Sequence, residues 1–222
     1  MQHHPYLKPH HKLERLKWCR PRLDWGFDRW GRVWWSDEVL IEQVSKRRDM
    51  AWLRPGDERR RKPDKRKTAK LKLSGSFGGS HLGHLTTIEK TLNAEKYITI
   101  LKEDLIPAGH YALGRKFIFM QDGHSAHRAK VTMKFLSGYV KRHRFIILPW
   151  PACSPDLNPI ENIWAEIGRI LAGKIFWNLR ELENEVRRIW DHLSKDYLTK
   201  LIESMPKRVA QVVERKGDKC DY

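Results

Sequence analysis

The stretch FIFMQDGHSAH, residues 117–127, decides the fold class of this chain. Its first four residues are apolar without alternation, a pattern typical of a short strand that is buried on both faces of a sheet. Polar residues follow at once, so the pattern places Asp122 just past the end of that strand. A similar apolar run, RFIILPW at residues 144–150, predicts a second buried strand.

Strands and helices alternate outward from this stretch. RVWWSDE at residues 32–38 predicts a strand whose apolar run ends at Ser36-Asp37, and LKLSGSFGG and GHLTTIEK at 71–90 predict two strands with a Gly-rich turn. Apolar residues at helical spacing predict helices at 11–23, 93–106, 127–143, 158–171 and 179–213, the last broken near Pro206. We therefore expect an α/β fold, a mixed sheet flanked by helices with a helical C-terminal segment.

Three acidic residues in recognisable contexts are the candidate catalytic and metal-binding residues. Asp37 and Asp122 sit at or past the ends of predicted strands, where sites collect in such sheets. Glu161, in WPACSPDLNPIENIW at 150–164, lies in the first turn of a predicted helix. If the two strands are neighbours, these carboxylates can hold divalent ions, since carboxylates and water are the ligands that Mg²⁺ and Mn²⁺ prefer. A paired-metal site of this kind cuts and joins phosphodiester bonds.

Each assignment has an alternative. Asn158 is a good N-cap with Pro159 after it, so Glu161 falls where a capping-box glutamate reaches back to the helix start, and the local pattern favours that role. Asp156 is a second candidate for the third carboxylate. Glu38 is a rival of Asp37, and because neighbours on a strand point to opposite faces, at most one of them would face the metal.

The charge of the chain indicates a polyanionic partner. Among 222 residues, 44 Lys and Arg stand against 27 Asp and Glu, which gives a formal net charge of +17. A basic excess of this size is typical of proteins that bind DNA or RNA. A soluble basic protein without such a partner is the alternative.

Two basic stretches hold the candidate DNA-binding residues. Residues 46–72 carry 13 basic and 4 acidic side chains, and residues 128–144 carry 6 basic and no acidic ones. Phosphate contacts of this kind supply affinity without reading sequence. A solvated loop and helix face, or a nuclear-import signal in ERRRKPDKRK, are alternatives. The candidates are Arg59, Arg60, Arg61, Lys62, Lys65, Arg66, Lys67, Arg128, Lys130 and Lys134.

Cysteine usage and hydropathy bear on the compartment. The three cysteines are scattered and form no CxxC pair, which favours a reducing environment over a zinc knuckle or a disulfide framework. We find no secretory signal and no apolar run near the roughly 20 residues of a membrane helix. We expect an intracellular protein, in the nucleus if the host is a eukaryote, with no membrane partner and no small-molecule cofactor.

The three acidic blocks, in this order, resemble the catalytic domain of the Tc/mariner-superfamily transposases, which carry an Asp-Asp-Glu triad. WGRVWWSDE, FIFMQDGHSAHRAK and ILPWPACSPDLNPIENIW are similar to the family's three blocks, and the third is the most specific. LNAEKYITIL and LIESMPKRVAQVVERKG also fit, so the resemblance covers about residues 10–217. We expect a flexible tail at 1–10, a catalytic domain at 11–217 with a basic loop at about 45–70, and a tail at 218–222.

The resemblance implies a ribonuclease-H-like fold and a metal-dependent DNA endonuclease and strand transferase. Asp37, Asp122 and Glu161 would hold two Mg²⁺ or Mn²⁺ ions, supported by His127, Asp156 and Asn158. The enzyme would cleave transposon ends and join them to target DNA, and it would act as a homodimer on DNA. His127 would orient a phosphate or a carboxylate, with packing at a helix start as its alternative role.

The chain departs from the family pattern at several points. The 38 residues between Asp122 and Glu161 exceed the spacing in many members. Ser74 stands where the family has a Trp before the Gly, which predicts a loosened core. The chain starts close to the catalytic domain, with no room for the two helix-turn-helix units of full-length members. A truncated or inactive remnant that binds DNA non-specifically is therefore an alternative, and a non-enzymatic DNA-binding module is a third reading.

Overall fold

A mixed sheet of six strands forms the centre of the fold in the computed structural model, which describes residues 6–43, 69–176 and 178–221. The strand order is β3-β2-β1-β5-β6, and β4 pairs with β2. Strand β1 runs antiparallel to β2 and parallel to β5, and β5 runs parallel to β6. The strands are β1 Val33–Gln43, β2 Ala69–Gly78, β3 His81–Leu82, β4 Thr86–Thr87, β5 Ile118–Met120 and β6 Ile146–Leu148.

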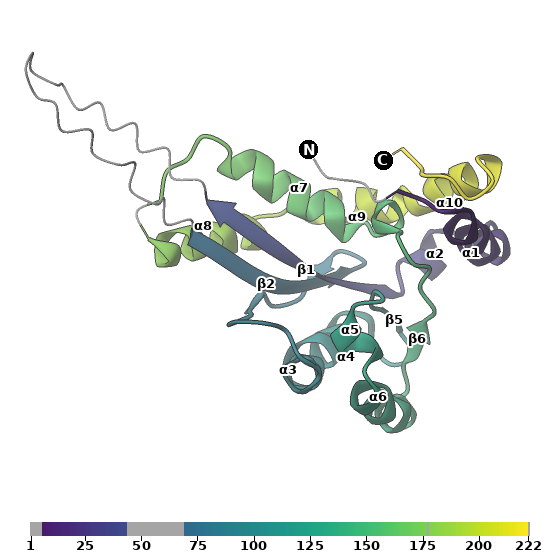
Figure 1. Ribbon diagram of the computed structural model, residues 1–222, viewed down its shortest axis with the longest axis horizontal. Coiled ribbons are helices and arrows are strands. Elements are labelled where there is room, and N and C mark those ends of the chain that lie inside the picture. Colours follow the sequence, from purple (N-terminus) through teal and green to yellow (C-terminus); the bar gives the residue numbers. More distant parts are fainter. Residues whose placement is uncertain (1–5, 44–68, 177, 222) are drawn as a thin grey trace, which may run out of the picture.

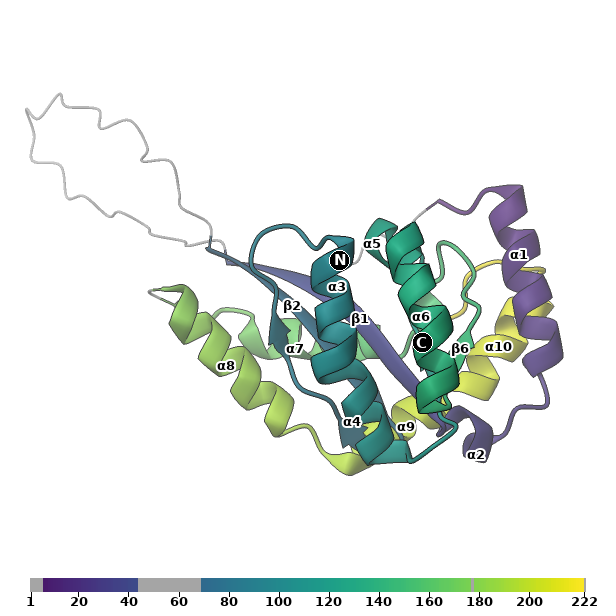
Figure 2. The same ribbon diagram turned by 90° about the horizontal axis from the view of Figure 1, so that it is seen from below.

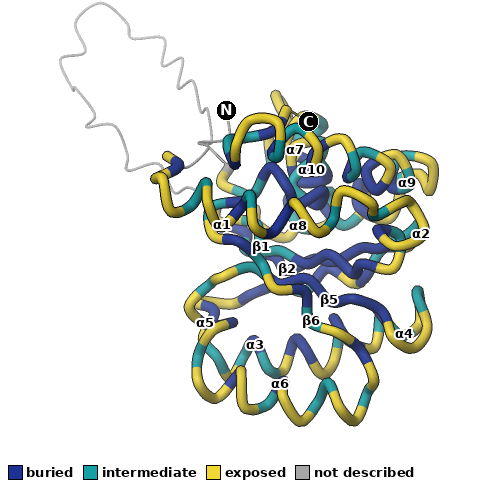
Figure 3. Tube along the Cα trace, turned by 90° about the vertical axis from the view of Figure 1, so that its right-hand side faces the viewer, coloured by how far each residue is buried: buried dark blue, intermediate teal, exposed yellow. Residues whose placement is uncertain are grey.

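Helices cover both faces of this sheet (Figure 1). Figure 3 shows the buried strands between one layer with α7, α8, α9 and α10 and another with α3, α5 and α6. The α-helices are α1 Pro9–Cys19, α2 Phe27–Trp30, α3 Ala94–Ile100, α4 Ile106–Leu113, α5 Ser125–Arg128, α6 Lys130–His143, α7 Ile160–Leu171, α8 Leu179–Asp191, α9 Lys195–Glu203 and α10 Met205–Glu214. The predicted mixed sheet flanked by helices is confirmed.

Two hydrophobic cores, one on each face, hold these layers to the sheet. Trp35 belongs to the core beneath α7 to α10, whereas its neighbour Trp34 belongs to the core beneath α3, α4 and α6. Successive side chains of a strand point to opposite faces, so a run of apolar residues in β1 feeds both cores. All three residues of β5 are buried, as the unbroken apolar run predicts.

Some element boundaries differ from the sequence prediction. Strand β1 does not end at Asp37 but continues to Gln43, because its ladder with β2 extends past the point where β5 stops. Strand β6 is not buried on both faces: it is the sheet edge, and Ile146 is 57% exposed. The predicted basic helix is two helices, since Ala129 has extended backbone with ψ of 141°.

Further differences concern helix continuity and the tails. The helix predicted at 93–106 is α3, a π-helical turn Leu101–Leu105 and the start of α4, and the C-terminal helical segment breaks at 192–194 as well as before Pro206. Helix α1 begins at Pro9, inside the expected tail 1–10. Cys220, in the expected tail 218–222, is buried. The basic loop at about 45–70 lies almost entirely outside the described residues.

Ser74, where the family has a Trp, is fully buried, and its hydroxyl has no hydrogen-bond partner within the described part of the chain. Its strand neighbour Leu73 is also fully buried but belongs to the core on the opposite face of the sheet. No helix in the described ranges combines the length and the apolar character that crossing a membrane requires.

Candidate active site

Asp37 and Asp122 lie side by side on neighbouring strands. Strand β1 pairs with β5 in parallel register with Trp35 opposite Met120, so each aspartate comes two residues further along its strand direction. The Ser36 hydroxyl donates a 2.7 Å hydrogen bond to the Met120 carbonyl and joins the two chains just before the aspartates. The strands of the two candidate carboxylates are therefore neighbours, which the sequence could only state as a condition.

Asp37 faces helix α7, which carries Glu161 and runs along β1 (Figure 1). The indole Nε1–H of Trp164 on α7 donates to Oδ2 of Asp37 at 3.2 Å. Gly75 makes this approach possible, because it stands opposite Asp37 on β2 and a Cβ there would lie 2.6 Å from Cη2 of Trp164.

Glu161 is the second residue of α7 and does not cap it. The residue before the helix is Pro159, which makes no side-chain cap bond, and the Oδ1 of Asn158 accepts a 3.4 Å bond from the Ile160 N–H. Asn158 also accepts, through its carbonyl, a 3.1 Å bond from the Glu161 N–H. The capping-box reading, which the local pattern favoured, is wrong, because the helix begins one residue later than that reading requires. The Glu161 carboxylate is free of that role.

Asp37, Asp122 and Glu161 lie close enough for their charges to affect one another's pKa. Burial raises the pKa of Asp37 well above its usual value, and the charges of Glu161 and Glu38 raise it further. Burial also raises the pKa of Glu161, and the charge of Asp122 adds to the effect. A bound cation would offset the repulsion that, together with burial, raises the pKa of Asp37 and Glu161, so these carboxylates fit a hard divalent ion such as Mg²⁺ or Mn²⁺.

His127 holds Asp122 from behind. The buried His127 places Nδ1 2.8 Å from Oδ1 of Asp122, and the His124 backbone N–H donates to the same oxygen at 2.8 Å. Burial alone would raise the pKa of Asp122, but these two hydrogen bonds lower it overall. Both bonds use Oδ1, so the other oxygen of this 43% exposed side chain stays available.

Glu38 completes a second group on the opposite face of β1. Its Oε1 lies 3.4 Å from Nε2 of His127, an ion-pair separation longer than a close hydrogen bond. Burial lowers the pKa of His127, yet the bonds to Asp122 and Glu38 outweigh it and raise that pKa to about 9. Donor atoms of Glu38, Asp122 and His127 lie within 4.8 Å of one another, a spacing that a metal could also use. A protonated His127 between two carboxylates offsets one of their two negative charges without an ion.

The expectation that Asp37 and Glu38 point to opposite faces is confirmed, and the structure gives each a different partner. Asp37 meets Trp164, whereas Glu38 meets His127. The pairing of Glu38 with His127 was missed in the sequence. The alternation of side chains along a strand could have indicated this pairing, because it places Glu38 on the face opposite to that of Asp37. In the structure Glu38 stands opposite Ser74, on the face that α3 and α5 cover.

Asp156 is not free to act as the third carboxylate. Its two oxygens accept hydrogen bonds from Nη1 and Nη2 of Arg15 at 2.7 and 2.5 Å, and its side chain is 2% exposed. Asn158, 3% exposed, lies in the same loop before α7. These two residues shape the loop that leads to Glu161.

The candidate DNA-binding residues fall into two groups. Arg128, Lys130 and Lys134 are exposed on α5 and α6, the helices that follow Asp122. The others, residues 59–67, lie outside the described part of the chain.

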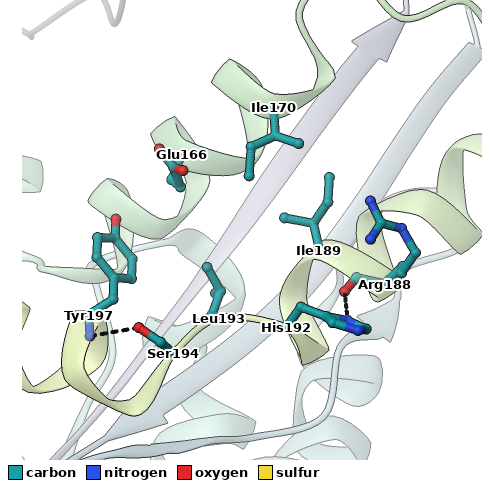
Figure 4. Close-up of a pocket in the computed structure, with 8 residues that line it drawn as sticks. All are labelled: Glu166, Ile170, Arg188, Ile189, His192, Leu193, Ser194 and Tyr197. Carbon is teal, nitrogen blue, oxygen red and sulfur yellow. Dashed lines mark hydrogen bonds between the residues drawn. The ribbon is translucent and has the colours of Figure 1, made fainter.

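A hollow of about 370 Å³ on another surface of α7 holds none of the candidate site residues. Its lining includes Glu166, Arg188 and Tyr197, which Figure 4 shows around the turn between α8 and α9. The three carboxylates lie elsewhere, on the central strand β1, just past the end of β5 and in the first turn of α7.

Comparison with known proteins agrees with this geometry. A family model described as "DDE superfamily endonuclease" matches residues 32–183. The Tc1 transposase of Caenorhabditis elegans is 28% identical over 98% of this chain and 80% of its own length. The Tcb1 transposase of Caenorhabditis briggsae is 29% identical over the same shares.

Solved structures show the same fold. The catalytic domain of Mos1 mariner transposase superposes with a TM-score of 0.76 at 20% identity, covering 98% of each chain. The Mos1 mariner paired end complex with Mn gives a TM-score of 0.79 at 20% identity, and this chain covers 67% of that protein. The fold is therefore the ribonuclease-H-like fold of the Mos1 catalytic domain. The chain belongs to the DDE superfamily endonucleases, and within them it is a transposase catalytic domain of the Tc/mariner type.

Proposed function

We propose that Asp37, Asp122 and Glu161 are the catalytic triad of this DNA endonuclease and strand transferase, and that they hold two Mg²⁺ or Mn²⁺ ions. The observation that carries the proposal is the placement of these side chains: Asp37 and Asp122 each follow the paired residues Trp35 and Met120 by two positions, and helix α7, which carries Glu161, bonds to Asp37 through Trp164. Burial raises the pKa of Asp37 and of Glu161, and the charges of neighbouring carboxylates raise both further. Bound there, the ions would supply activation of the attacking oxygen and stabilisation of the leaving 3′ oxygen.

The surrounding residues prepare the carboxylates for that role. His127 and the His124 N–H fix one oxygen of Asp122 and keep it ionised. Trp164 fixes one oxygen of Asp37. Each aspartate is thus oriented by a hydrogen bond from one side, as ligand carboxylates in metal sites generally are. This supports the role of His127 in orienting a carboxylate rather than a phosphate, since its ring is 2% exposed.

We further propose that the substrates are transposon ends and target DNA, bound by a homodimer in the nucleus of a eukaryotic host. The net charge of +17 and the exposed Arg128, Lys130 and Lys134 beside the site support a DNA partner. Binding that rests on phosphate contacts should weaken steeply as salt rises. The remnant reading is not favoured, because all three carboxylates are present and gathered.

The test is nicking of supercoiled plasmid by the purified protein with Mn²⁺ or Mg²⁺. Asp122→Asn and Glu161→Gln should each abolish nicking. Glu166→Gln is the matched control, since Glu166 lies on the same helix but pairs with Arg169 at the surface, and it should nick as the wild type does. Nicking that survives both triad substitutions would refute the assignment. A folded, DNA-bound protein that never nicks would support the remnant reading instead.

A further inference from the structure

We propose that Arg15 and Arg208 are positioning residues that hold the loop before α7 so that Glu161 can bind metal. The inference rests on the proposed role of Glu161. Arg15 lies on α1 and Arg208 on α10, so both stand outside residues 32–183, the segment that matches the family model. Helices α1 and α10 lie side by side in both ribbon views (Figures 1 and 2).

Arg15 fixes Asp156 with a two-pronged ion pair. Its guanidinium is fully buried, and Nη1 and Nη2 each donate to one oxygen of Asp156. The other donor contacts go to main-chain carbonyls: Nε to Gly217 at 3.0 Å, Nη1 to Cys153 at 3.3 Å and Nη2 to Asp218 at 3.3 Å. A guanidinium with so many partners of fixed direction sets the orientation of Asp156 as well as its charge.

Arg208 fastens the same loop at both ends. Its Nη1 donates to the carbonyl of Asp156 at 2.9 Å, and its Nη2 donates to Oδ1 of Asn162 at 2.7 Å. Asn162 follows Glu161 directly on α7, whereas Asp156 precedes the helix. One planar group therefore spans the turn on which Glu161 sits.

The chain between the two anchors is short and internally bonded. A 3₁₀ turn, Pro155–Leu157, leads to Asn158, whose Oδ1 accepts a 3.4 Å bond from the Ile160 N–H. Asn158 also accepts the Glu161 N–H through its carbonyl. A shift of Asp156 would pass through this series of bonds to the first turn of α7.

The C-terminal segment around Gly217 packs closely against α1, which places the Gly217 carbonyl within reach of Arg15. Gly217 has φ of +92°, and a Cβ there would lie 2.0 Å from the carbonyl oxygen of Lys12 on α1. Only glycine fits so close to that helix at this φ. The Cys220 N–H donates to Oδ2 of Asp156 at 2.9 Å, so Asp156 is bonded by Arg15, Arg208 and the C-terminal segment.

Packing alone does not explain this arrangement. Burying an ion pair carries a desolvation cost that apolar side chains of similar volume avoid, so a buried arginine is a poor choice for stability alone. Here two buried arginines converge on one loop, and that loop leads to a carboxylate of the site. A role in orienting Glu161 explains why both arginines are buried at this loop.

The test is a double-mutant cycle read by Mn²⁺ affinity, measured from the electron paramagnetic resonance signal of the free ion. Arg208→Met should weaken Mn²⁺ binding about 10-fold, the usual effect of losing a group that orients a ligand. In a Glu161→Gln background the same change should cost nothing further, because the effect passes through Glu161. Arg188→Met is the control: it removes a surface arginine on α8 that pairs with Glu185, and it should leave Mn²⁺ affinity unchanged.

A gentler variant covers the case in which Arg208→Met does not fold. Asn162→Ala removes only the acceptor on α7 and leaves both arginines in place, and it should weaken Mn²⁺ binding in the same Glu161-dependent way. Arg15→Lys keeps the charge but cannot make the two-pronged pair, so it should do likewise. Circular dichroism and melting temperature confirm that each variant compared is folded.

The outcomes separate this inference from the proposed function. Equal weakening of Mn²⁺ binding in the presence and absence of Glu161, or none at all in the folded variants, overturns the positioning role even if the wild type nicks plasmid. A Glu161-dependent loss of affinity in a protein that does not nick upholds the positioning role and counts against the proposed activity. A wild type that binds no Mn²⁺ overturns both.

Discussion

Trp164 of α7 donates its indole N–H to Oδ2 of Asp37 on β1 across 3.2 Å, and so joins the helix of one site carboxylate to the strand of another. Trp164→Phe keeps an aromatic side chain, although a smaller one, and removes the N–H donor. We expect the free energy of unfolding to fall by about 1 kcal/mol and Mn²⁺ affinity to fall about 10-fold. Urea unfolding and Mn²⁺ titration measure the two effects.

Trp190→Phe is the matched control for this prediction. Its ring stacks on Trp164 with centroids 5.3 Å apart, and its N–H donates to the Gly83 carbonyl, away from the carboxylates. A similar loss of stability without a change in Mn²⁺ affinity is expected. If both variants weaken metal binding alike, the bond to Asp37 has no special role.

Gly75→Ala should disturb the same contact by crowding. The added Cβ would lie 2.6 Å from Trp164 and 3.0 Å from Trp190, both buried rings. Overpacking of this kind typically costs about 1–3 kcal/mol, and displacement of Trp164 should also reduce nicking. Gly168→Ala, with nothing within 4 Å and a mid-helix position on α7, should instead stabilise by up to about 1 kcal/mol. Thermal unfolding of the pair checks the sign of each change.

Asp37→Asn should stabilise the metal-free protein while abolishing activity. Burial and the charges of Glu161 and Glu38 raise the pKa of Asp37, so the folded protein binds this proton more tightly than the unfolded chain does. The stability from that proton is present below the unfolded pKa and is lost as pH rises through the folded pKa. Removing the charge should therefore raise the melting temperature in EDTA at neutral pH, by about 2–4 °C for each kcal/mol recovered.

Added Mn²⁺ should reverse the order of the two melting temperatures, so that wild type melts higher than Asp37→Asn. A ligand that binds only the folded state raises the melting temperature, so wild type should gain and Asp37→Asn should not. An Asp37→Asn protein that melts lower than wild type in EDTA would contradict the proposed repulsion.

The three cysteines should react unequally with a thiol reagent. Burial raises the pKa of Cys19 and of Cys220 to about 12, and both side chains are buried. Thiolates are the reactive form, so these two should stay silent at pH 8. Cys153, which is only partly buried, should be modified first, and all three should react in guanidinium. Rapid modification of more than one thiol in the native protein would contradict this burial.

Local patterns predicted most of the sheet and its candidate site. The unbroken apolar run at 117–120 became the buried β5, and the alternation of a strand correctly separated Asp37 from Glu38. These features depend on residues close in sequence, where periodicity reports directly on burial. In the helix predicted at 158–171, the apolar residues at helical spacing are buried at Ile160, Ile163, Trp164 and Ile167 and only partly buried at Ile170 and Leu171.

Features that depend on distant partners were not predicted. The length of β1 is set by β2, and the exposure of β6 is set by its place at the sheet edge. The partner of Asp156 is Arg15, 141 residues away, and no local spacing reports such a pair. The start of α7 was misplaced by one residue because a good N-cap and a following Pro fit two registers.

The hydrogen bonds that Arg15, Arg208 and Cys220 make to Asp156 also affect the order in which the protein folds during synthesis. Arg15 is synthesised 202 residues before Gly217, to whose carbonyl it donates a hydrogen bond. Chains emerge from the ribosome in order, and contacts of such separation form only when both ends are present. The loop that carries Glu161 is thus completed last, so a nascent chain can build its sheet and both aspartates before the third carboxylate is set. The order of synthesis therefore delays the assembly of the proposed catalytic centre until residues 208–220 have emerged.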